Sequence, residues 1–478
     1  MSIGEVLNYL IIGVGVVVAL LASLFGGGVL LHLSHRYGQL IAPAFSAIIV
    51  SGIAVGAALS KRSLTFASTD IESISAGAGG GDNLLRLCTF LVVGFSAAKV
   101  GTYLLAQKRA PVLAGGAGLF AAFVAFFVGN VVLPSAFGTH PAFVHSSIYP
   151  VFVFAALYAA RTEPLETIVR VAKLALLALM VLSLVAAAAK PSLAVQPGYH
   201  GWIPGLNIRL WGLGSNPNSI GPLALLSLLL EVLQPSRRNL LRIAAIGSAG
   251  AVLVLSQSKT AWLAGIATLP FFAWYRFGRL GEGRVDIRFV LGVIATIIFA
   301  VGALAFVDLG RIWHKIMLTQ SGADIMSLTG RGKIWLVALA EWRASPWFGY
   351  GIEAWGAQHR LDIGLPFAFS AHNQFLQSLS VGGVFGLVSF VVYLVALGWA
   401  ALRFGVQSKG VSVALFLVIL LRSMTEAPYA FGTILNGDFL THLLLFSLCL
   451  RCAAAPRVVA PCAPRTLPSL PLPHPIQP

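Results

Sequence analysis

Long apolar runs alternate with short polar connections along most of the chain. Each run of about 17 to 25 apolar residues can cross roughly 30 Å of hydrocarbon as a helix. Segments such as Phe120 to Phe127 are apolar on every side and lack the alternation of a β-barrel strand. The pattern predicts an all-α polytopic integral membrane protein with about twelve or thirteen spans. These lie near 6–33, 39–60, 87–106, 112–131, 147–160, 169–189, 216–234, 240–257, 260–277, 287–307, 375–400, 410–424 and 438–450.

One connection is far longer than the others. Residues 308–374 form a large extramembrane loop, in which Gly332 to Arg343 reads as a helix that ends before Pro346, followed by a turn at Gly349-Tyr350-Gly351. Residues 452–478 are rich in proline, and we expect a disordered cytoplasmic tail there. We therefore expect residues 1–450 to form a single polytopic membrane domain with 308–374 as a loop within it.

Composition excludes an ordinary soluble protein. Of the 478 residues, 58% are apolar and only 10% are charged, where a soluble protein carries about 25% charged residues. The mean hydropathy is +0.87, which favours the bilayer as the solvent.

The formal net charge of +16 is distributed unevenly between the two predicted sides. Lys and Arg far outnumber acids in the connections around 108–109, 161–173, 237–242 and 276–288, which the positive-inside rule assigns to the cytoplasm. The opposite side, with 61–86, 190–215 and 308–374, is nearly balanced and is predicted to face the periplasm or the cell exterior. Since the basic residues lie in short loops and not on one soluble face, nucleic acid is not an expected partner.

The first candidate motif precedes the span that starts at Ser219. Arg209 is followed by Trp211-Gly212 and by Asn216-Pro217-Asn218. A guanidinium can bind a phosphate bidentately, and the Asn-Pro-Asn sequence suits a helix start, which is itself an anion site. The alternative is that Asn216 and Asn218 only cap the helix and Arg209 only reaches the interface.

The second motif is a polar island, Ser256-Gln257-Ser258-Lys259-Thr260, between two apolar spans. A lysine at membrane depth is costly unless it pairs with an anion, which makes Lys259 a functional candidate. A tight turn whose lysine reaches the headgroups is the alternative.

The third and fourth motifs lie in the large loop. Gly330-Arg331 with Ile334-Trp335 supplies cations and an aromatic face suited to sugar stacking, although an amphipathic helix lying on the membrane explains Trp335 as well. His372-Asn373 stands where the loop re-enters the membrane, and His372 is a candidate general base that Asn373 could orient. A helix-start histidine beside a capping asparagine is the alternative.

In this order the motifs resemble the O-antigen ligase and polymerase family of bacterial envelope glycosyltransferases. The resemblance spans roughly 200–390 and rests on Arg209 with Asn216-Pro217-Asn218, the Ser256 to Thr260 island, Gly330-Arg331 with Gly349-Tyr350-Gly351, and His372-Asn373 with Gly382-Gly383. Lys259 is a departure, because such proteins usually have arginine after the serine pair.

The resemblance implies transfer of a glycan from an undecaprenyl-diphosphate-linked donor, without nucleotide sugar or metal, at the periplasmic face of the bacterial inner membrane. The acceptor is lipid A-core in ligases and a second lipid-linked glycan in polymerases, and the sequence leaves this choice open. A lipid-oligosaccharide flippase or transporter is the alternative from another class. No histidine pair has metal-ligand spacing with a carboxylate, so we expect no metal site and no cofactor.

The residues fit this chemistry. A diphosphate leaving group requires cations aimed at it, for which Arg209, Lys259 and Arg331 are the candidates, and His372 is the candidate base for the attacking hydroxyl. A direct displacement inverts the anomeric configuration. Arg62 and Arg86 flank the first loop on the same side and are further candidates for binding donor or acceptor, as are Asn218, Trp335 and Asn373.

Overall fold

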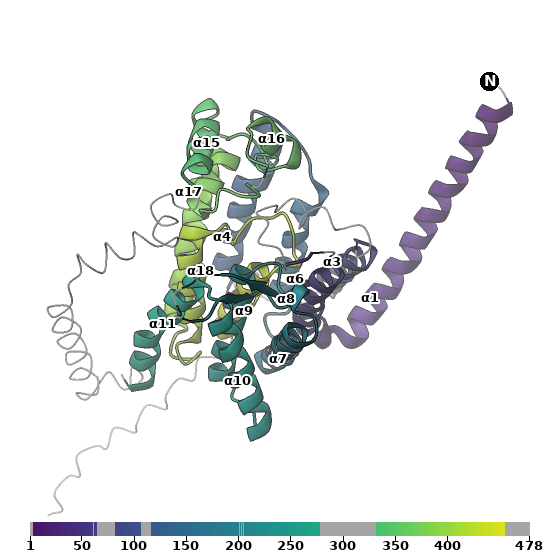
Figure 1. The fold of residues 1–478 in the computed structure, drawn as a ribbon. Coiled ribbons are helices and arrows are strands. Elements are labelled where there is room, and N and C mark those ends of the chain that lie inside the picture. The colour runs from purple at the N-terminus through teal and green to yellow at the C-terminus, as the bar shows by residue number, and fades with distance from the viewer. Residues whose placement is uncertain are drawn as a thin grey trace, which may run out of the picture.

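The computed structural model describes residues 3–60, 62–64, 82–106, 116–199, 201, 203, 205–277, 331–366 and 368–454. The long helices of the bundle are α1 (Ile3–Leu59), α3 (Asp82–Leu105), α4 (Ala117–Phe127), α6 (Tyr149–Ala159), α7 (Leu165–Ala189), α9 (Pro217–Leu233), α10 (Asn239–Leu255), α11 (Lys259–Phe277), α17 (Gln374–Arg403), α18 (Val411–Thr425) and α19 (Gly437–Ala454). Shorter elements are the π-helix η1 (Val128–Val132), α5 (Leu133–Phe137), the 3-10 helix η2 (His145–Ile148), α8 (Pro191–Ala194), α15 (Arg331–Ala344) and α16 (Ala357–Asp362). The protein is thus mostly helical, as its apolar pattern predicts (Figure 1).

Each predicted span coincides with a helix, apart from 287–307, which lies outside the described residues. The first two predicted spans are the two halves of α1, which bends at Tyr37, where φ is −121° and ψ is 26°. Among the described residues, 5 helices are long and apolar enough to cross a membrane, Phe25–Leu59, Asn83–Leu105, Ala117–Phe137, Leu165–Ala189 and Gln374–Arg403. The result fits a polytopic membrane protein.

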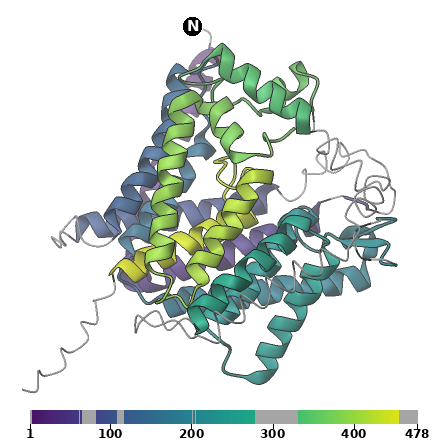
Figure 2. The ribbon, with the colours of Figure 1, turned by 90° about the vertical axis from the view of Figure 1, so that its left-hand side faces the viewer.

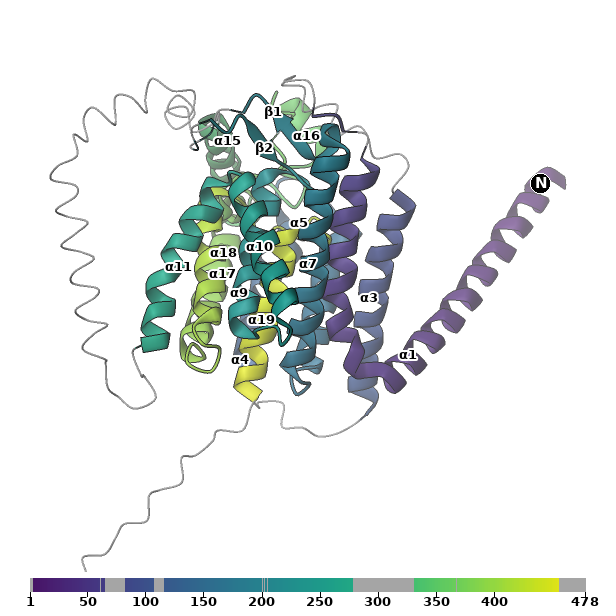
Figure 3. The same ribbon diagram turned by 60° about the horizontal axis from the view of Figure 1, so that its bottom comes forward.

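Where the structure describes them, the loops that the charge pattern assigned to opposite sides lie at opposite ends of the helix bundle. Figure 3 shows one end with α15, α16 and a two-stranded hairpin, and the N-terminal half of α1 extending away from the bundle at the other. We call the first of these the hairpin end. The ends of α1, α7, α10 and α18 and the starts of α3, α9, α11, α17 and α19 all lie there.

The hairpin itself was not predicted. Strand β1 (Val195–Pro197) pairs antiparallel with β2 (Ile208–Leu210), and Gln196 faces Arg209 across the pair. Both strands lie within 190–215, which the sequence indicated only as a loop. The hairpin gives Arg209 a fixed backbone position at the end of the bundle.

The described part of the large loop, from Arg331 on, folds against α17. Helix α15 coincides with the predicted helix, and Figure 2 shows α15 and α16 together near the start of α17. Ala338 of α15 is fully buried in a small second core with Trp355, Ala371 and Val381. The described part of the loop is therefore a packed structure that sets the position of the residues just before α17.

Helix α17 is broken at Gly383, which has φ +61°. The segment after α15 supplies partners at the break: the Tyr350 and Gly351 amides donate to the carbonyls of Ser380 and Val381, at 2.8 and 3.1 Å, and the Val384 amide donates to Pro346 at 2.8 Å. A Cβ on Gly383 would lie 2.4 Å from the carbonyl carbon of Trp347. Only glycine allows both this approach and this backbone conformation.

Candidate functional site

His372 lies just before α17. The packing of the loop against this helix and the break at Gly383 fix its position. Asn373 is the N-cap, and its side chain accepts from the amides of Phe375 and Leu376 at 3.0 and 3.1 Å. His372 has φ +47°, in the left-handed region that non-glycine residues rarely occupy and that is enriched at functional sites. The Trp335 indole donates to the Ala371 carbonyl at 3.0 Å, so α15 also holds the residue before His372.

Glu426 contacts the imidazole of His372. It directly follows α18, and its Oε2 lies 2.8 Å from Nδ1 of His372. Burial works to raise the pKa of Glu426, but the hydrogen bond with His372 and the charges of Arg422 and Arg331 outweigh it and lower that pKa below its usual value. The carboxylate is therefore ionised at neutral pH and accepts a hydrogen bond from the Nδ1–H group of His372.

This contact leaves the other ring nitrogen available as a base. With Nδ1–H donating to Glu426, the neutral imidazole carries its lone pair on Nε2. Nε2 of His372 has no hydrogen-bond partner among the residues that the structure describes. The side chain is 29% exposed, so a substrate hydroxyl can reach it.

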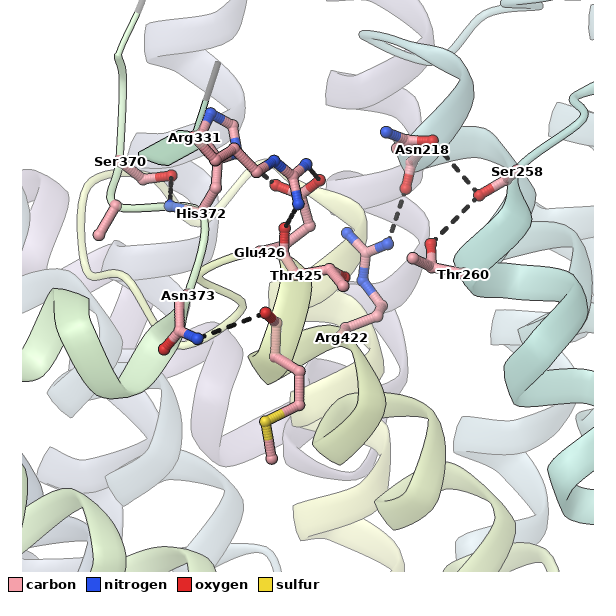
Figure 4. Close-up of polar contacts among 12 residues, drawn as sticks. Asn218, Ser258, Thr260, Arg331, Ser370, His372, Asn373, Arg422, Thr425 and Glu426 are labelled. Carbon is pink, nitrogen blue, oxygen red and sulfur yellow. Dashed lines mark hydrogen bonds and ion pairs between the residues drawn. The ribbon is translucent and has the colours of Figure 1, made fainter. Parts of the chain in front are cut away.

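Arg331 completes the group around Glu426. Its Nη2 lies 3.2 Å from Oε1 of Glu426, and its Nη1 donates to the Thr425 carbonyl at 2.7 Å. Asn373 makes a longer contact, 3.4 Å, with the Met424 carbonyl (Figure 4). The predicted residues Arg331, His372 and Asn373 thus gather around the end of α18.

Arg209 lies in a second group, around Asn218. Its Nη2 donates to Oδ1 of Asn218 at 3.0 Å and its Nε donates to the Ser256 carbonyl at 3.1 Å, while the guanidinium stands over the Tyr199 ring at 4.7 Å. Burial lowers the pKa of Arg209, and the charge of Tyr199 works in the opposite direction. Ser258 approaches the same Asn218 oxygen at 3.5 Å.

The polar island is a tight turn between α10 and α11. Gln257 has φ +46° and donates to the Ile208 carbonyl at 2.7 Å, which joins the turn to β2. Helix α9 packs closely on it, since a Cβ on Gly221 would lie 2.7 Å from Cβ of Ser258. Lys259 is the first residue of α11 and directly follows Ser258, which approaches Asn218 of the Arg209 group.

Arg422 joins the two groups. It is 4% exposed, and it donates from Nε and Nη2 to the two oxygens of Asp438, at 2.6 and 2.8 Å, and from Nη1 to the Asn218 carbonyl at 2.8 Å. Figure 4 shows this side chain between Glu426 and Asn218. Motifs that lie far apart in the sequence therefore form one polar site.

Sequence reasoning missed Arg422, Glu426 and Asp438 as site residues. One signal was available, because an arginine inside an apolar span is a functional candidate by default. The four-residue spacing to Glu426 then puts an acid about one helical turn further on.

Arg62 and Arg86 do not join this site. Arg62 is buried, and its guanidinium donates to the carbonyls of Leu193, Gly212, Gly214 and Ser215 at 2.6 to 3.3 Å, so that it ties the end of α1 to the hairpin region. Burial lowers the pKa of Arg62 to about 10. Arg62 and Arg86 both line a cavity to which Ser215 and Ser219 also contribute. Their part in substrate binding stays a prediction.

The side chains of the site can act on a substrate through proton transfer, hydrogen bonds and positive charge. Within the described ranges, no group of three His, Cys, Asp or Glu side chains is placed to hold a metal ion. The arrangement offers a base at Nε2 of His372 and two guanidinium groups, Arg209 and Arg331, on either side of Arg422.

Residues 243–391 match the family model of the O-antigen ligase family. The match runs from α10 into α17 and includes Lys259, Arg331, His372 and Asn373, while Arg209 and Glu426 lie outside it. No curated protein matches the chain. The match confirms the resemblance that the motifs indicated.

Proposed function

We propose that this chain transfers a glycan from an undecaprenyl-diphosphate-linked donor to a sugar of lipid A-core, at the periplasmic face of the inner membrane. The match of residues 243–391 to the O-antigen ligase family supports a membrane glycosyltransferase of this kind. The observation that carries the proposal is the convergence of His372, its carboxylate partner and the two arginine groups on one end of the bundle.

His372 acts as the general base. The acceptor hydroxyl oxygen attacks the anomeric carbon of the donor, its proton passes to Nε2 of His372, and the bond between that carbon and the diphosphate oxygen breaks. The ionised Glu426 stabilises the imidazolium that results, as a carboxylate does for a catalytic histidine in general. Attack opposite the leaving group inverts the anomeric configuration.

The cations stabilise the diphosphate as it takes the electron pair of the broken bond. Arg209 and Lys259 lie around the 256–260 turn and are the primary candidates, since preorganised positive groups at a developing charge provide the largest share of such catalysis. Arg331 is held by Glu426, so it contributes charge at the site while also fixing the carboxylate. No metal ion is required by this set of groups.

The proposal is tested with the purified chain in lipid nanodiscs, given an undecaprenyl-diphosphate-linked glycan and lipid A-core. We expect glycan-bearing lipid A-core and undecaprenyl diphosphate in equal amounts, an inverted anomeric centre by NMR, and an unchanged rate in the presence of a chelator. Retention of configuration, or a rate that depends on a divalent ion, contradicts the mechanism. Product only when a second lipid-linked glycan replaces lipid A-core identifies a polymerase.

A further inference from the structure

A cavity of about 1150 Å³ opens at the hairpin end between α1, α3 and η2. The residue 215–219 turn and the loop 432–436 complete its lining. His372, Arg209 and Arg331 are not among the residues that line it. The cavity is therefore distinct from the polar site described above.

The lining combines apolar and polar side chains. Ile53 of α1 and Leu85, Phe90 and Val93 of α3 form apolar walls on membrane-spanning helices. The polar residues of the lining include Arg86, His145, Tyr149, Ser215, Thr433 and Asn436. Such a combination fits an amphipathic molecule that has a lipid part and a part rich in hydroxyl groups.

The size of the cavity favours a large ligand. Pockets for single small molecules measure roughly 300–1,000 Å³, and this cavity exceeds them. There is room for more than one sugar ring beside a lipid chain.

The cavity and the Arg209 group lie on opposite sides of one turn. The Asn218 side chain contacts Arg209, whereas the next residue, Ser219, lines the cavity. The loop that follows α18 makes a second connection, because it begins at Glu426, which contacts His372, and continues into the cavity wall at Thr433. The same loop therefore connects the carboxylate partner of His372 to the wall of the cavity.

The cations in the lining are Arg62 and Arg86. Arg62 is buried, and its guanidinium is already engaged by carbonyls of the hairpin region, while Arg86 is exposed. We therefore assign the diphosphate to the Arg209 and Lys259 side of the turn and the lipid-anchored glycan to the cavity.

We infer that this cavity binds the lipid-anchored acceptor glycan, so that donor and acceptor enter from opposite sides of the 215–219 turn. The inference rests on the proposed function, because it assigns one of the two substrates of that reaction. It predicts that filling the cavity weakens acceptor binding selectively.

Two tryptophan substitutions on the same helix test it. Thr89 lines the cavity, whereas Leu87, two residues earlier, does not and is 49% exposed. In nanodiscs, Thr89→Trp should raise the KM for lipid A-core by about tenfold or more and keep the KM for the donor within about twofold, and Leu87→Trp should change neither. Ser146→Trp fills the cavity from η2 and replaces Thr89→Trp if the latter does not fold.

Binding is measured separately by native mass spectrometry of the full chain in detergent. Lipid A-core, undecaprenyl diphosphate and phosphatidylglycerol are the three probes. We expect the cavity-filling variants to lose the lipid A-core adduct and to keep the undecaprenyl diphosphate adduct. Survival of the first adduct, loss of the second, or equal displacement by phosphatidylglycerol overturns the assignment. If lipid A-core binds in this way but no glycan is transferred, the proposed function fails and the binding site stands.

Discussion

Among the residues that the structure describes, two histidine–carboxylate pairs lie at the hairpin end, and one of them belongs to the candidate site. His372 Nδ1 and Glu426 are 2.8 Å apart, and His359 Nε2 and Glu341 are 2.9 Å apart. The His359 side chain is 11% exposed, against 29% for His372, and its ring packs on Tyr350 at 4.0 Å. A short contact to a carboxylate is therefore common to a packing histidine and to a candidate base.

The surroundings separate the two pairs. Glu426 also meets Arg331, and Arg422 beside it leads to the Asn218 and Arg209 group. The arginine next to His359, Arg360, is instead held by the Pro366 carbonyl and stands over Phe369. What makes the first pair a candidate site is an accessible nitrogen with several cations converging beside it.

Removing each histidine should give the largest difference between the pairs. His372→Ala is expected to lower kcat for glycan transfer by about 10²- to 10⁴-fold, while His359→Ala stays within about threefold, because only the first removes a general base. Transfer rates of both variants in nanodiscs, at matched amounts of inserted protein, measure this. Near-normal product from His372→Ala contradicts the role of the base, and equal losses in both variants indicate a structural role.

Removing each carboxylate charge should have a smaller effect. Glu426→Gln keeps the size of the side chain and loses a charge-assisted hydrogen bond that is worth about 1.5–3 kcal/mol, which corresponds to a decrease in kcat of roughly 10- to 100-fold. Glu341→Gln is the matched control and should leave kcat unchanged. The idea fails if Glu426→Gln retains the wild-type kcat with correctly inserted protein.

The arginines near each pair provide a third comparison. Arg209→Ala should raise the KM for the lipid-linked donor by about tenfold, as expected for one lost charge-assisted contact, and should leave the KM for lipid A-core unchanged. Arg360→Ala is the control beside the other pair. Wild-type donor kinetics in Arg209→Ala, with unaltered thermal stability, would make Arg209 an interfacial anchor only.

The smallest expected effect is on stability against pH. The pKa of Glu426 is lowered in the folded protein from its ordinary value of 4.5. Its ionised form therefore stabilises the fold fully above pH 4.5, and this contribution is lost as the pH falls through the lower folded value. The melting temperature of Glu426→Gln should lie below that of the wild type by on the order of 1–2 °C at pH 6, and the difference should shrink below pH 4.5. A difference that is constant with pH contradicts the ionised state.

The spans and the motif residues could be predicted from the sequence because both are local properties. An apolar run long enough to cross a membrane forms a helix regardless of its neighbours, and Asn373 caps α17 through contacts two and three residues away. The pairing of His372 with Glu426 joins residues 54 apart in the sequence. Nothing local at either residue specifies that partner, and the same holds for Arg422 and the Asn218 carbonyl.

Arg62 shows a second limit of sequence reasoning. Its place beside a predicted span made it a candidate for binding a substrate, but its guanidinium is occupied by backbone carbonyls of residues 193 to 215. Those carbonyls become available only because the 190–215 segment folds into a hairpin. Whether an arginine is hydrogen-bonded to backbone carbonyls depends on the tertiary structure, and the spacing of residues in the sequence does not reveal it.

The break in α17 has a consequence for how the chain is made. A span with an interrupted hydrogen-bond ladder is not self-sufficient in hydrocarbon, and here the Ser380 and Val381 carbonyls have their amide partners in Tyr350 and Gly351, which precede the span in translation order. We therefore expect the first turns of α17 to reach their final form only once that segment has docked on them. Because His372 stands just before this span, we expect the candidate base to take its position in the same docking step.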